Sequence, residues 1–155
     1  MLRTFTAALA VAATAIGAVS AQPIEPNVAL QREKMAALSM MIGEWRGEGW
    51  MMTRGGRVEF SQSEVVTPRL GGNVILVNGT GRASGAAADA EPIFEALAVI
   101  AYDEAAQKYM MRSYAQGRAG DFEIRPRADG FSWSLPNVDY DATIADGVWT
   151  EKGFY

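Results

Sequence analysis

The sequence predicts an all-β fold, an antiparallel up-and-down barrel preceded by one short helix. After Gly43 the chain consists of short segments rich in Val, Ile, Phe, Tyr and Trp. Turns containing Gly or Asp separate these segments at intervals of about ten residues, which is typical of antiparallel sandwiches and barrels. Because short turns join neighbouring strands, a meander is the simplest topology, and closing the meander into a barrel removes exposed strand edges.

Residues 1–21 have the layout of a secretory signal peptide. Arg3 supplies a positive start, the run from Ala7 to Val19 is uncharged and rich in Ala, and small residues precede Gln22. The apolar run of about thirteen residues is shorter than the roughly 20 that cross a hydrocarbon core as a helix. We therefore expect cleavage after Ala21, a periplasmic or secreted protein, and no membrane span in the mature chain. A retained membrane anchor is the alternative.

The next segments predict a leader and a helix. Residues 22–28 contain two prolines and should form a flexible leader. In residues 29–41, Leu30, Met35 and Leu38 recur at near-helical spacing, with charged residues between them. This pattern predicts one short amphipathic helix, whose apolar side we expect to pack against the barrel.

The rest of the chain, up to residue 155, should form the strands of a single domain that spans residues 29–155. Tight turns are expected where Gly supplies a positive φ, as in Asp129-Gly130 and Asp146-Gly147. The small, polar segment 83–92 predicts a mobile loop between the third and fourth strands. The nine predicted strands span residues 44–54, 57–67, 73–81, 94–102, 108–116, 120–126, 130–136, 139–145 and 147–155.

The composition excludes several functions. The chain has 14 basic and 18 acidic residues and no basic cluster, which argues against binding to nucleic acid or to anionic lipid. It has no Cys, so no disulfide can stabilise it, and no His, the usual ligand of zinc and haem. Ser-His-Asp and Cys-His catalysis are therefore impossible. We expect no cofactor, no metal site and no enzymatic activity.

A helix that leads into Gly-x-Trp-x-Gly at the start of the first strand resembles the calycins, which include lipocalins, fatty-acid-binding proteins and the haem-binding nitrobindins. Here the motif is Gly43-Glu44-Trp45-Arg46-Gly47. Over most of residues 30–155 the chain is also similar to an uncharacterised family of exported bacterial lipocalin-like domains, domain of unknown function 1579. That similarity includes Leu70-Gly71-Gly72, Ala101-Tyr102-Asp103 and the segment 113–118.

The resemblance implies a barrel with a central cavity for a ligand that is not assigned. By analogy with lipocalins, Trp45 would plug the closed end of the barrel near the helix, and Gly43 would permit the tight entry into the strand. Haem binding through histidine, as in nitrobindins, is excluded, and nothing selects one tyrosine for that role. Members of the family continue past the equivalent of residues 151–155 into a closing strand. The resemblance therefore implies a truncated C-terminus and a barrel that lacks its last strand.

Five residues are candidate ligand contacts, of which Trp50 is an aromatic residue of the first strand. Arg112 and Tyr114 share one face of their strand and Tyr102 ends the strand before it, so these three could contact a polar ligand in the cavity. The alternative for them is a solvated arginine with tyrosines that line the core.

The fifth candidate, Arg118, lies between two glycines in a predicted hairpin turn, where it could bind a ligand carboxylate through bidentate hydrogen bonds. Its alternative is an ion pair with Asp121 or hydrogen bonds to turn carbonyls. Glu59 and Glu64 have odd spacing on one strand, so they should face opposite sides of the sheet and form a poor acid–base pair.

Three functions remain open at this point. The preferred one is binding of a small hydrophobic or amphipathic ligand in the barrel. The second is a structural or interaction domain of the cell envelope, with a barrel filled by side chains. The third is an enzyme independent of His and Cys, which would require an inward-facing carboxylate with a raised pKa. The sequence leaves the oligomeric state open.

Overall fold

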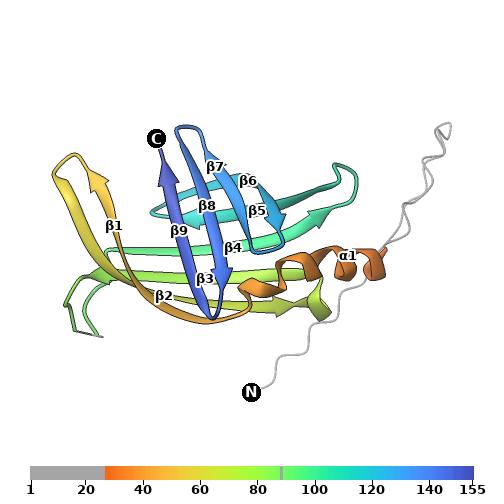
Figure 1. Ribbon diagram of the computed structural model, residues 1–155, viewed down its shortest axis with the longest axis horizontal. Helices are drawn as coiled ribbons and strands as arrows, with labels where there is room; N and C mark the ends of the chain where they lie inside the picture. Colours follow the sequence, from red (N-terminus) through yellow and green to blue (C-terminus); the bar gives the residue numbers. More distant parts are fainter. Residues whose placement is uncertain (1–26, 88) are drawn as a thin grey trace, which may run out of the picture.

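The computed structural model describes residues 27–87 and 89–155, which form one nine-stranded antiparallel sheet. Each strand pairs with the next along the chain, in the order β1 to β9, and the sheet curls into a nearly closed barrel (Figure 1). The all-β fold and the up-and-down topology predicted from the sequence are thus confirmed. The expected signal peptide, and the leader up to residue 26, lie outside the described residues.

The nine strands agree with the predicted ones to within a few residues. They span β1 (Gly43–Thr53), β2 (Gly56–Arg69), β3 (Val74–Ala83), β4 (Phe94–Asp103), β5 (Lys108–Ala115), β6 (Arg118–Arg127), β7 (Gly130–Leu135), β8 (Val138–Ala145) and β9 (Val148–Phe154). The predicted Asp146-Gly147 turn joins β8 to β9 with φ values of 53° and 74°. Positive φ at both central residues matches the right-handed twist of a two-residue hairpin.

The predicted helix forms but changes its geometry halfway. The α-helix α1 (Val28–Met35) begins one residue before the predicted start, and the Asn27 side chain caps it by accepting a hydrogen bond of 3.0 Å from the Leu30 N–H. A 3₁₀ helix, η1 (Ala36–Met41), follows. Side chains three residues apart align in a 3₁₀ helix. No helix in the described part of the chain is long and apolar enough to cross a membrane.

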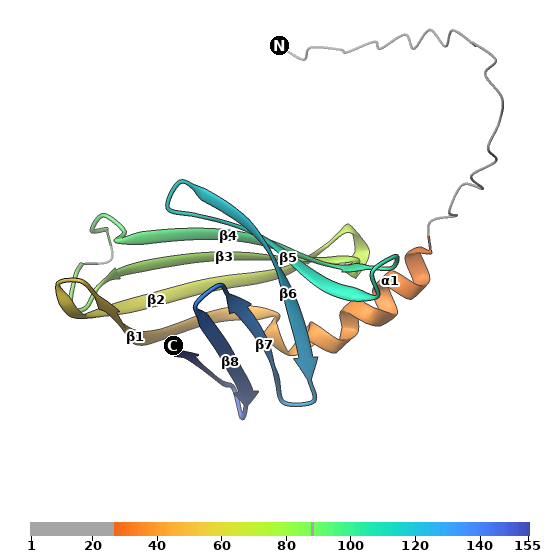
Figure 2. The ribbon, with the colours of Figure 1, turned by 90° about the horizontal axis from the view of Figure 1, so that it is seen from above.

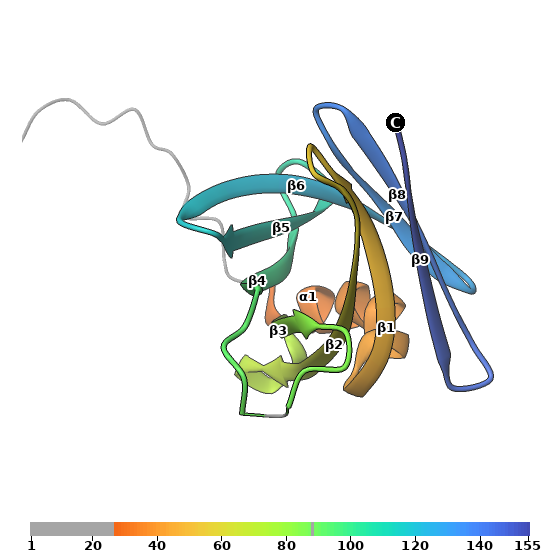
Figure 3. The same cartoon turned by 90° about the vertical axis from the view of Figure 1, so that its left-hand side faces the viewer.

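The helical segment crosses one end of the barrel (Figures 2 and 3). The apolar core lies between this segment and the strands. The buried side chains come from one row of the helical segment and from inward positions of six strands. Burial of each large side chain contributes about 1.5–3 kcal/mol to folding. The cluster consists of Met35, Leu38, Met41, Val66, Ile75, Ile100, Ile124, Phe131 and Ala142.

Further from the helix, aromatic rings lie directly over glycines of the interior surface. A Cβ atom at Gly49 would come within 2.6 Å of the Phe60 ring, and one at Gly81 within 2.0 Å of the Phe94 ring. Phe60 is the register partner of Gly49 on the neighbouring strand, and Phe94 that of Gly81. The rings therefore occupy the space that a side chain would fill at each glycine.

The barrel is open between its first and last strands. In the described sheet, β1 pairs with β2 alone and β9 with β8 alone. We call the gap between β1 and β9 the seam. At the helix end of the seam, the rings of Trp45 and Trp149 meet edge to face with centroids 5.5 Å apart. Side chains, rather than backbone hydrogen bonds, therefore hold the two edge strands together.

Candidate functional site

Two carboxylates face the barrel interior. Glu64 on β2 is flanked in register by Trp45 on β1 and Gly79 on β3, and it lies two residues from the buried Val66 on the same face. Glu151 on β9 is the register partner of the buried Ala142. Because side chains alternate along a strand, both glutamates point inward. They are the acidic residues at the inward positions of the nine described strands.

Glu64 is half-buried and has one side-chain partner. The Gln62 side chain, two residues earlier on the same face, donates a hydrogen bond from Nε2 to Oε1 of Glu64. The carboxyl lies over Gly79, where a Cβ would come within 3.4 Å of its Oε1 atom. Burial raises the pKa of Glu64 above its ordinary value, and the hydrogen bond from Gln62 offsets part of this rise.

Among the carboxyl groups of the described residues, that of Glu151 has the most strongly shifted pKa. Burial among interior side chains raises its pKa to about 7, and the negative charge of Glu64 adds to the rise. The indole N–H groups of Trp133 and Trp149 lower it in part. The residue as a whole stays exposed because β9 is an edge strand, so water still reaches the carboxyl.

Aromatic rings surround the interior beside these carboxyls. Trp133 stacks on Tyr140 with centroids 4.3 Å apart and an interplanar angle of 8°, and Phe122 meets the same indole edge to face at 5.7 Å. Phe60 and Phe94 form a further edge-to-face pair at 5.4 Å. All of these rings are half-buried rather than buried. The interior thus offers flat apolar surfaces next to groups that accept or donate hydrogen bonds.

The described residues contain no group of three or more Asp, Glu, His or Cys side chains that could hold a metal ion. The carboxyl pair is accompanied by an amide and by indole N–H groups instead. This arrangement suits hydrogen bonding and proton exchange.

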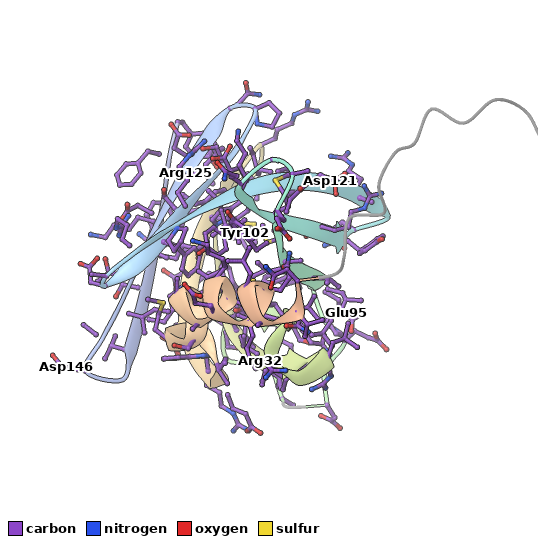
Figure 4. All side chains as sticks on the ribbon, turned by 90° about the vertical axis from the view of Figure 1, so that its right-hand side faces the viewer. Arg32, Glu95, Tyr102, Asp121, Arg125 and Asp146 are labelled. Carbon is purple, nitrogen blue, oxygen red and sulfur yellow. The ribbon has the colours of Figure 1, made fainter. Side chains whose placement is uncertain are left out.

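Three of the five residues predicted to contact a ligand lie on the outer face of the sheet. Trp50 is 57% exposed, and the Arg57 guanidinium lies over its ring at 4.8 Å. Arg112 forms an exposed ion pair with Asp121 at 2.5 Å and lies 5.6 Å above the ring of Tyr114. The predicted alternative of a solvated arginine thus describes the surroundings of Arg112. Asp121 and Arg125 lie on the outside of the barrel (Figure 4).

The other two predicted contacts are far from each other. Tyr102 packs against the core beside the helix, edge to face with Tyr109 at 5.1 Å, and Lys34 lies 5.8 Å above its ring. Arg118 begins β6 at an inward register position and, with Tyr114, lines an open depression of about 490 Å³. The structure therefore does not bring the five residues into one cavity. A role for them in ligand binding stays a prediction.

Gly43 and Trp45 lie at the helix end of the barrel. Gly43 has a φ of 152°, and the Trp45 Nε1–H donates a hydrogen bond of 2.8 Å to the Met41 carbonyl, the last of η1. The indole packs against the core cluster. This bond joins the end of the helical segment to the first strand, where the lipocalin analogy places a plug.

The sequence predicts that Glu59 and Glu64 face opposite sides of the sheet, and the structure agrees. Glu59 is the register partner of the outward-facing Trp50, and it forms an ion pair with Arg57 at 3.0 Å. The same reasoning missed Glu151. One signal was present, because a residue two positions from an inward tryptophan on a strand shares its face.

Comparisons with protein-family models, curated proteins and solved structures gave no match. The resemblance to calycins and to the exported bacterial family therefore stays a prediction.

Proposed function

We propose that this protein is an exported, lipocalin-like barrel that binds a small, partly apolar molecule in its interior. One observation supports the proposal most: beside the aliphatic core, the inward positions of the barrel carry half-buried aromatic rings and two carboxyls rather than aliphatic side chains alone. Sites for small molecules are mostly apolar and aromatic, with a few polar groups that fix orientation.

The position of Glu64 and Glu151 argues against a barrel filled only by side chains. A carboxylate in a dry interior costs several kcal/mol unless it is paired with a cation or well hydrogen-bonded. None of the ion pairs of the described residues involves either glutamate, and Gln62 is the hydrogen-bond partner of Glu64. An interior that water or a polar ligand group can enter removes this cost. A barrel that binds a small molecule in its interior needs an interior of this kind.

The chemistry of the lining defines the ligand class. Trp133 and Tyr140 offer flat surfaces for an aromatic or other apolar body, and the carboxyl pair suits a group that donates hydrogen bonds. We therefore expect an amphipathic molecule small enough for one barrel. We expect this binding to take place outside the cytoplasm, because residues 1–21 have the layout of a secretory signal peptide.

Native mass spectrometry beside denatured mass spectrometry tests the proposal directly, since a retained molecule appears as a mass difference. A second measurement uses the neutral probe N-phenyl-1-naphthylamine, whose fluorescence increases in apolar sites. Ser113 is the register partner of the buried Ala98 and faces the interior, whereas Ser132 pairs with Asp141 and faces outward. Ser113→Phe should weaken probe binding at least about tenfold by filling the cavity, and Ser132→Phe should leave it unchanged.

Thermal unfolding of both variants shows whether each folds. A wild-type protein that carries no extra mass and does not bind the probe would contradict the proposal and favour the filled envelope domain. Equal loss of probe binding in the two folded serine variants would place the probe outside the barrel.

The carboxyl pair favours acid–base catalysis as a second candidate, because one carboxyl with a raised pKa beside another can supply an acid and a base at the same pH. Catalysis requires binding in the same interior first. If a bound molecule is identified, Glu151→Gln should abolish its conversion while retaining its binding. Unchanged conversion by that variant would eliminate this candidate.

A further inference from the structure

We propose that Glu64 and Glu151 form a proton-controlled closure of the seam. When the pair carries at least one proton, the two carboxyls lie side by side and the seam is closed. When both are ionised, they repel each other and the seam widens. The proposal concerns the strands themselves and does not depend on whether a ligand binds.

The first observation is that nothing in the backbone fixes the width of the seam. In the described sheet, β9 is hydrogen-bonded to β8 alone and β1 to β2 alone. The position of β9 relative to β1 therefore depends on side-chain contacts. The Trp45–Trp149 pair provides one such contact at 5.5 Å, and Trp149 also meets Phe131 edge to face at 5.5 Å. Edge-to-face aromatic pairs are worth only about 0.5–1.5 kcal/mol beyond their burial.

The second observation is that the two carboxyls lie beside this contact, on either side of the seam. Glu64 is the register partner of Trp45, and Glu151 follows Trp149 by two residues on the same face of β9. Because the two indole rings touch, the residues next to them are brought to the same level of the barrel. The carboxyls are close enough for the charge of Glu64 to raise the pKa of Glu151.

The third observation is that no cation neutralises the pair from the interior. The titratable groups facing Glu151 are Glu64 and the Tyr140 phenol on β8, whose pKa is raised by burial and by the charges of Tyr155 and Glu151. Trp133, Trp149 and Gln62 are neutral. Inward positions of the other strands contribute Tyr102 and Tyr109 at the core, beside Lys34 of α1, and Arg118 at the β5–β6 turn.

Charged residues on the strands next to the pair face outward. These are Glu44, Arg46 and Glu48 on β1, Arg57, Glu59 and Arg69 on β2, Arg82 on β3, Asp121, Glu123, Arg125 and Arg127 on β6, Asp139 and Asp141 on β8, and Lys152 on β9.

Proton control follows from these positions. Two neighbouring like charges that lack a cation repel each other, whereas a carboxylic acid beside a carboxylate can donate a hydrogen bond to it. Aspartyl pairs that share a proton behave in this way. The pKa of about 7 for Glu151 places the change near neutral pH. The seam should therefore be closed in acid and wider in base.

The experiment measures the seam directly. The chain has no Cys, so two introduced cysteines can carry spin labels without further changes. Ser63→Cys on β2 and Thr150→Cys on β9 place both labels on outward positions on either side of the seam. Double electron–electron resonance at about pH 5.5 and about pH 8.5 should show a longer and broader distance distribution at the higher pH, with a midpoint near 7.

Matched variants assign this shift to the pair. Glu151→Gln in the doubly labelled protein should keep the short distance at both pH values, and Glu64→Gln should do the same from the opposite side of the seam. Glu44→Gln, which removes the same charge from the outer face of β1, should keep the wild-type response.

An identical distance distribution at both pH values in the wild-type protein would overturn the proposal without any variant. It would also be overturned if a folded glutamine variant at position 151 or 64 widened as the wild-type protein does. Absence of a ligand in the mass measurement above would leave this result unaffected, so the two proposals can fail separately.

Discussion

The raised pKa of Glu151 links the stability of the barrel to pH in a direction opposite to that of most carboxylates in proteins. The folded pKa is about 7, against an ordinary value of 4.5. Between these values the folded chain binds more protons than the unfolded chain. The contribution of Glu151 to the free energy of unfolding is therefore greatest at and below about pH 4.5. This contribution is lost as the pH rises through 7.

The size of the effect follows from the same values. A rise from 4.5 to about 7 corresponds to at most about 3 kcal/mol at 25 °C. Glu151 is an exposed residue on an edge strand, so solvent screening reduces the loss to about 1–2 kcal/mol. Glu64 contributes in the same direction, because its pKa is raised too.

Urea unfolding at about pH 5 and about pH 8 measures this loss. Because other groups also titrate, the informative quantity is the difference between the wild-type protein and Glu151→Gln at each pH. The glutamine cannot ionise, so the variant should be more stable than the wild-type protein by about 1–2 kcal/mol at pH 8 and nearly equal to it at pH 5. Glu44→Gln is the control, on the outer face. The reasoning would be refuted if the difference in stability between Glu151→Gln and the wild-type protein were the same at pH 8 as at pH 5.

Two further predictions concern the architecture. Trp45→Phe removes the hydrogen bond to the Met41 carbonyl and part of an aromatic contact, and should lower the free energy of unfolding by about 1–3 kcal/mol in a denaturant titration. Gly81→Ala places a methyl group 2.0 Å from a phenylalanine ring and should cost about 1–3 kcal/mol. Gly47→Ala, where a Cβ would meet nothing within 4 Å, should change the melting temperature little. Equal melting temperatures for the two alanine variants would contradict this account of the glycines.

The strands could be predicted because their signals are local. Residues such as Asp146 and Gly147 encode a tight turn through their own backbone preferences, and the apolar segments between turns have the length of strands. The prediction of the helix was less complete, since the change to 3₁₀ geometry at Ala36 depends on fitting Leu38 against the sheet. That fit is a tertiary effect.

The candidate site was harder to predict because it depends on which face of each strand points inward. Trp50 was chosen as an interior residue, yet it lies five positions after the inward Trp45, and an odd separation reverses the face. Glu64 and Glu151 come together only because the sheet curls until its last strand approaches its first. No local pattern in the sequence predicts that curvature of the sheet.

The meander also has a consequence for the speed and order of folding. Every backbone pairing joins strands that follow each other along the chain, so each hairpin closes a short loop at low entropic cost. Topologies with mostly local contacts fold faster than those with distant pairings. The Trp45–Trp149 contact is not local, since it joins the two ends of the sheet. We therefore expect refolding to finish with this contact, as a slow phase of tryptophan fluorescence after most of the β-sheet circular dichroism has been recovered.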